Sequence, residues 1–328
     1  MASPSIIDIL IIGAGPAGLS CAIEAQKAGL RSLVLDKGTI ADAIQRFQRE
    51  MFFFSTPELL SIGDLPFIVG TVRPTSRDCV VYYRAVVRHY DLQCRLYEKV
   101  TGIQRDGNLF KVLTGAGAEY TARAVVIATG YYDTPTFLNV PGEDLPHVTH
   151  YYRDPFPHFD REVLIVGGKN SAVEAALDLW RNGARVTVVH RGAALSSGVK
   201  YWILPDFENR VKDGSIGLLL QTTVREFRPG SVLLSGTDGT MLERRADAVF
   251  VLTGYRTDAV FLRSFGIDVD ADTLAPVHNP ATMETNVPGL FVAGGLVGGR
   301  FNNKIFIENG REHGKKIIPA LTVRLRES

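Results

Sequence analysis

Two stretches of the chain share one pattern of hydrophobic and polar positions: an apolar run, a glycine turn, an amphipathic segment and a second apolar run. The first stretch comprises residues 6–12, 13–18, 19–28 and 30–35, and the second comprises 162–166, 167–172, 173–181 and 185–189. Continuous apolar runs are typical of buried parallel strands, and apolar spacing of three and four residues is typical of helices. The pattern therefore predicts two strand–helix–strand units.

Short apolar runs separated by turn residues follow each of these units and indicate antiparallel strands. The runs in the first such region, 94–126, are 96–100, 109–113 and 124–127, and a similar region covers 218–253. Helical patterns are found over 39–50, over 79–90 and near the C-terminus from about residue 305. We expect a small antiparallel meander between parallel elements.

Residues 131–158 are irregular and rich in Pro, Tyr and His, a composition typical of a crossing between domains. We therefore expect an α/β protein with two Rossmann-like dinucleotide-binding domains, each built of three layers. The first domain is expected to be discontinuous, formed by residues 1–130 and 254–328, and the second to span residues 131–253. A length of 328 residues is consistent with two domains.

The first glycine turn has the spacing Gly13-x-Gly15-x-x-Gly18 between a strand and a helix. Gly13 permits the tight turn, Gly15 lets a pyrophosphate approach the backbone, and Gly18 lets the helix pack close to the strand. The helix N-terminus offers unpaired N–H groups to the phosphates. Asp36 ends the next apolar run, 18 residues after Gly18, where a carboxylate can hydrogen-bond a ribose 2′-OH. We infer an FAD site here.

The second turn has the spacing Gly167-x-Lys169-x-x-Ala172, in which lysine replaces the middle glycine. His190 ends the next apolar run at the same offset of 18 residues, Arg191 follows it, and Lys200 is nearby. Basic residues at this position suit a 2′-phosphate, whereas an acidic residue suits a free 2′-OH. We therefore infer NADPH at the second site; the alternative for Arg191 is a solvated surface arginine.

Composition narrows the class of protein. With 45% hydrophobic residues, 22% charged residues and a net charge of +1, the chain is expected to bind neither nucleic acid nor membrane through a broad electrostatic attraction. Cys21, Cys79 and Cys94 show no spacing typical of a metal site or a disulfide framework, which favours a reducing cytoplasm. The apolar run 6–12 is too short to span a bilayer.

A cluster of three phenylalanines, Phe52, Phe53 and Phe54, precedes Ser55 and Thr56. We expect most of these rings to pack in the core and the two hydroxyl residues to be candidate ligand contacts. The alternative is an aromatic wall around a flat ring system.

Two strand ends resemble the pyridine-nucleotide-disulfide oxidoreductase superfamily: Ala128-Thr129-Gly130, and the run 290–295, where an aspartate commonly follows the glycine and this chain has Gly295. The size is similar to that of low-molecular-weight thioredoxin reductases. Those enzymes carry a CxxC just before the second glycine turn, whereas residues 150–160 contain no cysteine. A dithiol relay at that position is therefore absent.

Nearly the whole chain resembles the bacillithiol-disulfide reductase (YpdA-like) family. The stretches that carry this resemblance are 128–133, 140–146, 167–171, 202–205, 253–255, 283–287 and 305–311. It implies an FAD-dependent, NADPH-consuming reductase of a low-molecular-weight thiol disulfide. Family members have a cysteine, proposed to act in disulfide reduction, where this chain has Ala17. Cys21, four residues further along the same helix, is expected to be a buried helix cysteine.

The two glycine turns and the resemblance together imply a set of cofactor-binding residues, with no catalytic side chain and no metal ligand. They are Gly13, Gly15, Pro16, Ala17, Gly18, Asp36, Lys37, Gln45, Val100, Thr129, Gly130, Gly168, Lys169, Asn170, Ser171, His190, Arg191, Lys200, Gly254, Gly294, Ile305 and Ile307. A helix starting near Ile305 would direct its first N–H groups at the flavin, unless it is an ordinary amphipathic terminal helix.

The expected partners are a small-molecule disulfide, a small redox protein and a second copy of the chain. The main alternative function is NADPH-dependent electron transfer to ferredoxin or flavodoxin, which needs no redox cysteine. A flavin monooxygenase of the Baeyer–Villiger type is disfavoured because its Phe, Gly and Trp signature is absent around His150. A non-catalytic dinucleotide sensor is the remaining alternative.

Overall fold

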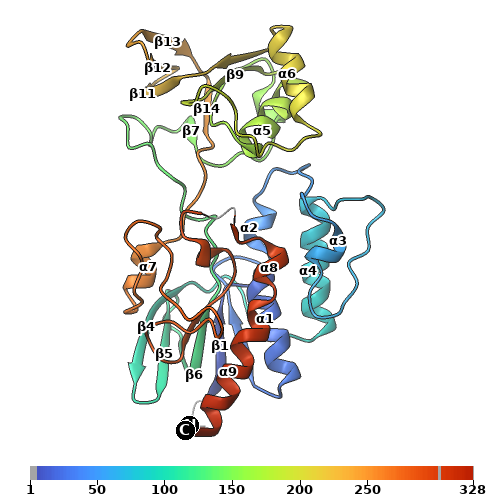
Figure 1. The fold of residues 1–328 in the computed structure, drawn as a ribbon, viewed down its shortest axis with the longest axis vertical. Helices are drawn as coiled ribbons and strands as arrows, with labels where there is room; N and C mark the ends of the chain where they lie inside the picture. The colour runs from blue at the N-terminus through green and yellow to red at the C-terminus, as the bar shows by residue number, and fades with distance from the viewer. Residues whose placement is uncertain (1–5, 302–303, 328) are drawn as a thin grey trace. The chain divides into compact units, whose positions relative to one another are not determined.

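The computed structural model describes residues 6–301 and 304–327, and within them the chain divides into two compact units (Figure 1). The first unit contains the chain up to Gln45, Ser55–Thr134 and the chain from Tyr255 onward. The second unit contains Arg46–Phe54 and Pro135–Gly254. Residues 46–54 thus belong to the second unit, although the chain on both sides of them belongs to the first.

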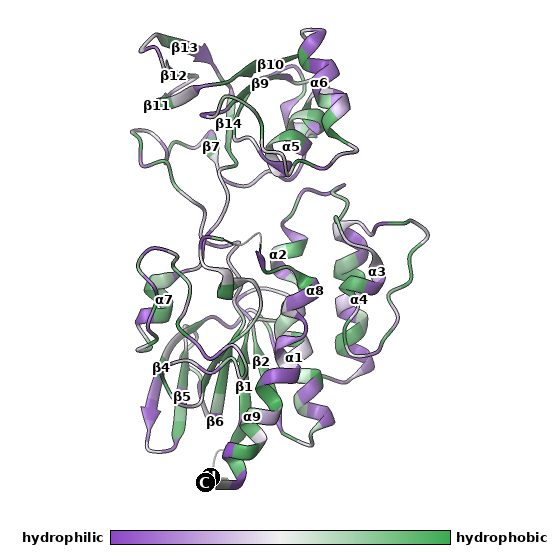
Figure 2. Ribbon diagram, viewed as in Figure 1, coloured by the Kyte–Doolittle hydropathy of each residue, from purple (hydrophilic) through white to green (hydrophobic). Residues whose placement is uncertain are grey.

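The first unit is built on a sheet whose strand order is β3-β2-β1-β6-β5-β4, with β15 also paired to β6. The strands are β1 (Ile7–Ile12), β2 (Ser32–Leu35), β3 (Cys94–Arg95), β4 (Val100–Asp106), β5 (Leu109–Thr114), β6 (Glu119–Ile127) and β15 (Leu290–Val292). Strands β1, β2, β3, β6 and β15 pair in parallel, so their carboxyl ends share one edge. Figure 2 shows β1 as hydrophobic and the edge strand β4 as largely hydrophilic.

The predicted antiparallel meander is present as β4-β5-β6, but its first strand was placed too early. It spans Val100–Asp106 instead of 96–100. Just before it, the Tyr97 N–H donates to the Gly38 carbonyl and the Glu98 N–H donates to the Asp36 carbonyl. Tyr97 and Glu98 are therefore hydrogen-bonded to the segment just after β2 and are not part of the meander.

Helices cover this sheet, and α9 packs against α1. The helical elements of the unit are α1 (Pro16–Lys27), α2 (Asp42–Gln45), α3 (Pro57–Leu60), α4 (Ser76–His89), α7 (Ala259–Arg263), the 3₁₀ turn η2 (Gly294–Gly298), α8 (Ile307–Gly310) and α9 (His313–Glu327). Gly314 permits the close approach, because a Cβ on it would lie 3.0 Å from the Cα of Cys21. Leu10, Val125 and Val292 form part of the core around the strands.

The predicted helix over 39–50 was wrong in length, since α2 ends at Gln45 and the chain then enters the second unit. The expected burial of the phenylalanines was also mostly wrong. Phe52 is 44% exposed and Phe54 is 60% exposed, while Phe53 is half-buried beside Phe47. The local hydrophobic pattern does not show that this segment belongs to the second unit.

The second unit has three layers. The middle layer is a parallel sheet with the order β10-β9-β8-β14-β7. Helices α5 and α6 lie on one face of this sheet, and the antiparallel sheet β11-β12-β13 lies on the other. The elements are β7 (Val148–Thr149), the 3₁₀ turn η1 (Phe156–His158), β8 (Glu162–Val166), α5 (Asn170–Arg181), β9 (Arg185–Val189), α6 (Leu204–Lys212), β10 (Ile216–Leu219), β11 (Thr222–Arg228), β12 (Ser231–Gly236), β13 (Met241–Arg245) and β14 (Ala248–Val251). Val163 and Ile165 of β8 pack with α5 and α6, whereas Leu164 and Val166 pack with β11 and β12. The alternation of side chains along a strand thus buries both faces.

Across residues 6–301 and 304–327, no helix combines the length and the apolar character needed to cross a membrane.

Candidate cofactor-binding sites

The first glycine turn joins β1 to α1, and its glycines have separate geometric roles. Gly13 has φ +116°, and a Cβ on it would lie 2.4 Å from the Ala128 carbonyl oxygen. A Cβ on Gly18 would lie 1.9 Å from the Gly13 carbonyl oxygen. By contrast, apart from the adjoining chain, no atom of the described residues lies within 4 Å of the Cβ position of Gly15. Gly13 and Gly18 are therefore needed by the fold, while Gly15 faces open space.

This open space lies at the N-terminus of α1. Gly15 is the N-cap residue, Pro16 begins the helix, and no side chain among the described residues caps the first turn. The first N–H groups of a helix need partners from outside it, and a phosphate can supply them. The donor set and the space above Gly15 thus fit a pyrophosphate.

Asp36, at the end of β2, is hydrogen-bonded to the same turn. The Ala14 N–H donates to its Oδ2 at 2.7 Å, and the Gly38 N–H donates to its Oδ1 at 2.7 Å. Burial raises the pKa of this carboxyl, and the two N–H donors oppose that shift. A carboxylate oxygen has more than one lone pair, so Asp36 can accept a further hydrogen bond from a ribose hydroxyl.

The other residues expected near this site lie in several elements. Lys37 forms an ion pair with Asp133 at 2.9 Å, and Gln45 Oε1 accepts a hydrogen bond from Arg84 at 2.9 Å. Val100 begins β4 and is buried. The contact of these three residues with a cofactor stays a prediction.

At the shared carboxyl edge of β1, β6 and β15, several chain segments converge on Gly294. Its φ is +76°, and a Cβ on it would lie 2.7 Å from the Cβ of Ala17. A Cβ on Gly295 would lie 2.5 Å from the Cε1 of Tyr131, in the turn that follows Thr129 and Gly130. A Cβ on Gly310 would lie 3.2 Å from the Gly294 Cα. The start of α1, the turn after β6 and the end of α8 therefore meet at Gly294.

The helix expected to start near Ile305 is present as two helices. Helix α8 begins at Ile307 and ends at Gly310, and α9 begins at His313. Ile305 precedes α8, and its side chain lies 3.5 Å from the Cβ position of Gly298. Ile305 therefore contacts the 3₁₀ turn that follows Gly294.

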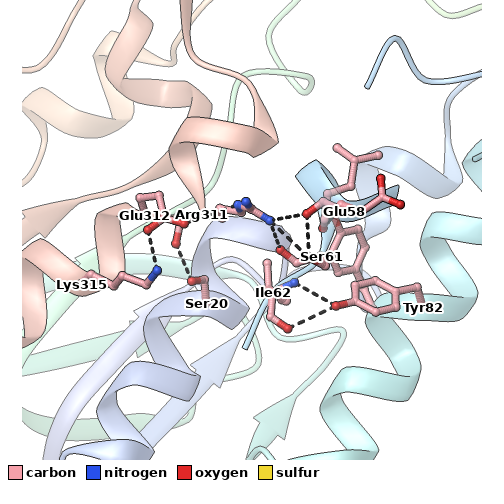
Figure 3. Close-up of polar contacts among 10 residues, drawn as sticks. Ser20, Glu58, Ser61, Ile62, Tyr82, Arg311, Glu312 and Lys315 are labelled. Carbon is pink, nitrogen blue, oxygen red and sulfur yellow. Dashed lines mark hydrogen bonds and ion pairs between the residues drawn. The ribbon is translucent and has the colours of Figure 1, made fainter. Parts of the chain in front are cut away.

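Arg311, between α8 and α9, ties this region to two other elements (Figure 3). Its guanidinium donates to the Glu58 carbonyl at 2.9 Å and to the Ser61 Oγ at 3.3 Å. The Arg311 carbonyl in turn accepts a hydrogen bond from the hydroxyl of Ser20 on α1. Nearby, the Ile62 N–H donates to the Tyr82 hydroxyl at 2.8 Å, which joins the same segment to α4. The junction of α8 and α9 is thus held against α1.

His313 was missed by the sequence analysis, although it contacts Gly294 directly. The Gly294 N–H donates to His313 Nδ1 at 3.0 Å, so the proton of the neutral ring is on Nε2. The side chain is buried, and burial, with smaller effects of Lys316 and His278, lowers its pKa from 6.5 to about 4. A buried neutral histidine is therefore the acceptor that fixes the Gly294 amide.

This geometry predicts an acid-sensitive contribution of His313 to stability. The unfolded chain takes up the proton near pH 6.5 and the folded chain only near pH 4, so the free energy of unfolding falls as the pH is lowered through this window. We expect the wild type to lose about 2 kcal/mol more than His313→Asn between pH 7.5 and 5, because asparagine can accept the hydrogen bond without titrating. Urea unfolding at both pH values measures the difference. Parallel pH profiles of the two proteins would contradict this assignment.

The second glycine turn joins β8 to α5. A Cβ on Gly167 would lie 2.8 Å from the Leu252 carbonyl oxygen, and a Cβ on Gly168 would lie 2.3 Å from His190 Nδ1. Lys169 is exposed and is the N-cap residue of α5, with no side chain among the described residues capping that helix. This turn therefore also presents an uncapped helix N-terminus, with an imidazole packed on its glycine.

The basic residues after β9 differ in their surroundings. Arg191 is exposed, as a ligand of a phosphate needs to be. The pKa of His190 is lowered by burial and by the neighbouring Arg191, so the ring is largely neutral at pH 7. Arg191 is therefore the charged member of this pair. Ser171, in the first turn of α5, and Gly254, with φ +96° at the end of the unit, are also exposed.

Two expected ligands already have protein partners. Asn170 Oδ1 accepts from the Lys200 N–H at 2.7 Å, and its Nδ2 donates to the Gly198 carbonyl at 3.1 Å. The Lys200 ammonium forms an ion pair with Glu174 and donates to the Phe52 carbonyl at 2.8 Å. The Lys200 side chain is only 6% exposed, so its ammonium is directed at these protein partners.

None of the cysteines offers a thiolate at neutral pH. Cys21 and Cys79 are buried, Cys94 is half-buried, and all are free. Burial raises the pKa of Cys21 to about 12 and that of Cys94 to about 11, and it also raises the pKa of Cys79. Ala17 therefore has no neighbouring thiolate that could replace a cysteine at its position. Among the described residues, no cluster of three or more His, Cys, Asp or Glu side chains is arranged to hold a metal ion.

The chain is similar to a known protein family, to curated proteins and to solved structures. Residues 10–294 match the family described as pyridine nucleotide-disulphide oxidoreductase. Bacilliredoxin reductase Bdr of Bacillus subtilis (strain 168) is 41% identical over 315 residues, which cover 96% of this chain and 97% of that protein. The structure of bacillithiol disulfide reductase Bdr (YpdA) from Bacillus cereus has a TM-score of 0.94 and 42% identity, covering 98% of this chain and 100% of that one. The predicted resemblance to this group is confirmed.

More distant similarities bear on the fold. Thioredoxin reductase of Lactococcus lactis, with a TM-score of 0.79 and 23% identity, covers 98% of this chain and 100% of its own. Together with the sheet topology described above, this confirms the predicted two-domain Rossmann-like fold of the thioredoxin reductase type. A ferredoxin–NADP reductase of Thermus thermophilus is 28% identical over 298 residues, which cover 88% of this chain and 84% of that protein.

Proposed function

Since the chain belongs to the pyridine nucleotide-disulphide oxidoreductase family, we propose that it is an FAD-dependent reductase that uses NADPH to reduce a low-molecular-weight disulfide such as bacillithiol disulfide. The family implies the use of a flavin and of NAD(P)H. Similarity over nearly the full length to proteins named for bacillithiol disulfide and bacilliredoxin supports the substrate class.

The observation that carries this proposal is the pair of uncapped helix N-termini, each at a glycine turn on the carboxyl edge of a parallel sheet. We assign FAD to the turn with open space above Gly15 and Asp36 beside it, and NADPH to the turn followed by Arg191. The FAD domain would be residues 1–130 and 254–328 without residues 46–54, and the NADPH domain would be residues 131–253 together with 46–54.

Bound FAD would supply the two-electron carrier between the nucleotide and the acceptor. The overall reaction would consume NADPH, a proton and a disulfide, and release NADP⁺ and two thiols. This chain's own part would be binding and orientation, because Ala17 lacks a thiol and burial keeps the three cysteines protonated. We therefore propose that disulfide reduction proceeds without a protein–substrate mixed disulfide.

The test is anaerobic reduction of the purified protein by NADPH, followed by separate challenges with bacillithiol disulfide, another low-molecular-weight disulfide and ferredoxin. We expect reoxidation of the flavin absorbance by a disulfide. A variant with Cys21, Cys79 and Cys94 all replaced by serine is expected to keep at least half of the disulfide turnover. Reoxidation by ferredoxin alone would contradict the proposed substrate, and loss of turnover in a folded triple variant would contradict the thiol-free route.

Electron transfer to ferredoxin or flavodoxin is the second candidate, favoured by the missing redox cysteine and by the similarity to a ferredoxin–NADP reductase. The same challenge decides between the two. We further propose that the protein acts in a reducing cytoplasm as a homo-oligomer, and that a small redox protein is an additional acceptor.

A further inference from the structure

Segment 46–54 is bound to the second unit by polar contacts on several of its residues. The Arg49 N–H donates to the Arg153 carbonyl at 3.1 Å, and the Arg49 guanidinium pairs with Asp154 at 3.1 Å. Gln48 Nε2 donates to Asp178 Oδ2 at 3.1 Å on α5. The segment is therefore attached both to the chain before β8 and to the helix that follows the glycine turn.

The contact at Phe52 involves two buried charged side chains. The Lys200 ammonium donates to the Phe52 carbonyl at 2.8 Å and forms an ion pair with Glu174, and the two charged side chains are 6% and 13% exposed. Breaking a buried pair by removing one partner leaves an uncompensated charge, which is strongly unfavourable. This ammonium thus holds the segment on α5 at a place shielded from water.

The same lysine is also joined to the nucleotide-binding turn through its backbone. Its N–H donates to Asn170, the first residue of α5, at 2.7 Å, and Glu174 lies one turn further along that helix. Nearer to Arg191, the Ser196 N–H donates to the Gly168 carbonyl at 2.9 Å. The loop that carries Arg191 is therefore fixed at the glycine turn and again at Lys200.

Aromatic rings add further contacts between segment 46–54 and the loop that carries Lys200. The ring of Phe54 lies 5.5 Å from that of Trp202, and the Lys200 ammonium lies 5.8 Å from the Trp202 ring centroid. A cation near an aromatic face is stabilised by the ring quadrupole. Lys200 thus has partners on α5, on segment 46–54 and on its own loop.

We propose that Lys200 is a positioning residue that couples segment 46–54 to the nucleotide-binding turn, and that it is not a ligand of the 2′-phosphate. The proposal rests on the proposed function, in which this turn binds NADPH. The turn would face the pyrophosphate, which NADPH and NADH share. Loss of the coupling should therefore weaken the binding of both nucleotides equally. A phosphate ligand would instead affect NADPH alone.

The first experiment measures the dissociation constants of NADPH and NADH for the wild type, Lys200→Met and Glu174→Gln. We expect Lys200→Met to raise the dissociation constants of both nucleotides about tenfold and to leave the ratio of the two constants unchanged. Glu174→Gln, a nearly isosteric change, is expected to weaken both by a smaller factor. A selective loss of NADPH in Lys200→Met would overturn the proposal. So would tighter NADPH binding in Glu174→Gln, the result expected if that carboxylate withheld the ammonium from phosphate.

The second experiment follows trypsin cleavage after Arg46 and Arg49. Coupling is reciprocal, so NADP⁺ should slow cleavage of the wild-type segment. In Lys200→Met, cleavage should be at least tenfold faster and the protection lost, whereas Lys212→Met, an exposed lysine of α6, should behave as the wild type. Equal cleavage of wild type and Lys200→Met would overturn the proposal. If the wild type binds neither nucleotide, the proposed function fails, while cleavage without nucleotide still decides whether Lys200 holds the segment.

Discussion

Gly15→Leu is expected to give a folded protein that is purified without FAD. At this position φ is −80° and ψ is 177°, a backbone conformation that any residue adopts, and no described atom lies within 4 Å of the added Cβ. The leucine would instead fill the space in which a pyrophosphate approaches the helix N-terminus. We expect FAD affinity to fall by at least roughly 100-fold, or about 2.7 kcal/mol. The ratio of visible to ultraviolet absorbance of the purified protein measures the bound FAD.

The matched control is Gly70→Leu, since Gly70 is another glycine of the first unit with no described atom near its Cβ position. This variant should keep FAD. Gly18→Ala provides the opposite case, because its Cβ would lie 1.9 Å from the Gly13 carbonyl oxygen and the fold itself should be destabilised. A Gly15→Leu protein with one FAD per chain would show that the first turn is not the pyrophosphate site.

Arg191→Ala is expected to remove the preference for NADPH over NADH. Arg191 is exposed at the end of β9, and a guanidinium can donate two hydrogen bonds to one phosphate. A hydrogen bond to a charged group is worth about 1.5–3 kcal/mol, and the net loss of one such bond would raise the KM for NADPH roughly 10- to 150-fold. The KM for NADH should change less than twofold, because NADH has no 2′-phosphate.

Steady-state kinetics with both nucleotides measure this effect, with Arg244→Ala, an exposed arginine of β13, as the control. An unchanged KM for NADPH in Arg191→Ala would return Arg191 to the alternative of a solvated surface arginine. Lys200→Met is expected to lower the affinity for both nucleotides equally. The two variants therefore distinguish a ligand of the phosphate from a residue that positions the turn.

Features set by neighbouring residues could be predicted from the sequence. The glycine turns are such a case, since Gly13 and Gly18 are required by close contacts within one strand–turn–helix unit. The parallel strands were recognisable because both of their faces are buried. Asp36 could be placed for the same reason, as β2 lies directly beside β1.

Contacts between distant parts of the chain were decided by the tertiary structure alone. Lys200 bonds to the carbonyl of Phe52, 148 residues away, and nothing in the pattern around either residue indicates the other. The sequence suggested Lys200 as a phosphate ligand, and only the structure shows its buried ion pair with Glu174. His313 likewise became a partner of Gly294 only because α9 packs beside α1 at the end of β15.

The sequence by itself thus determined the two glycine turns, the fold class and the absence of a thiol at Ala17. These properties depend on local backbone geometry or on residue identity. The assignment of residues 46–54 to the second unit, and the partners of Lys200 and His313, depend on which distant surfaces bury each other, and the hydrophobic pattern of a single segment does not specify its partner.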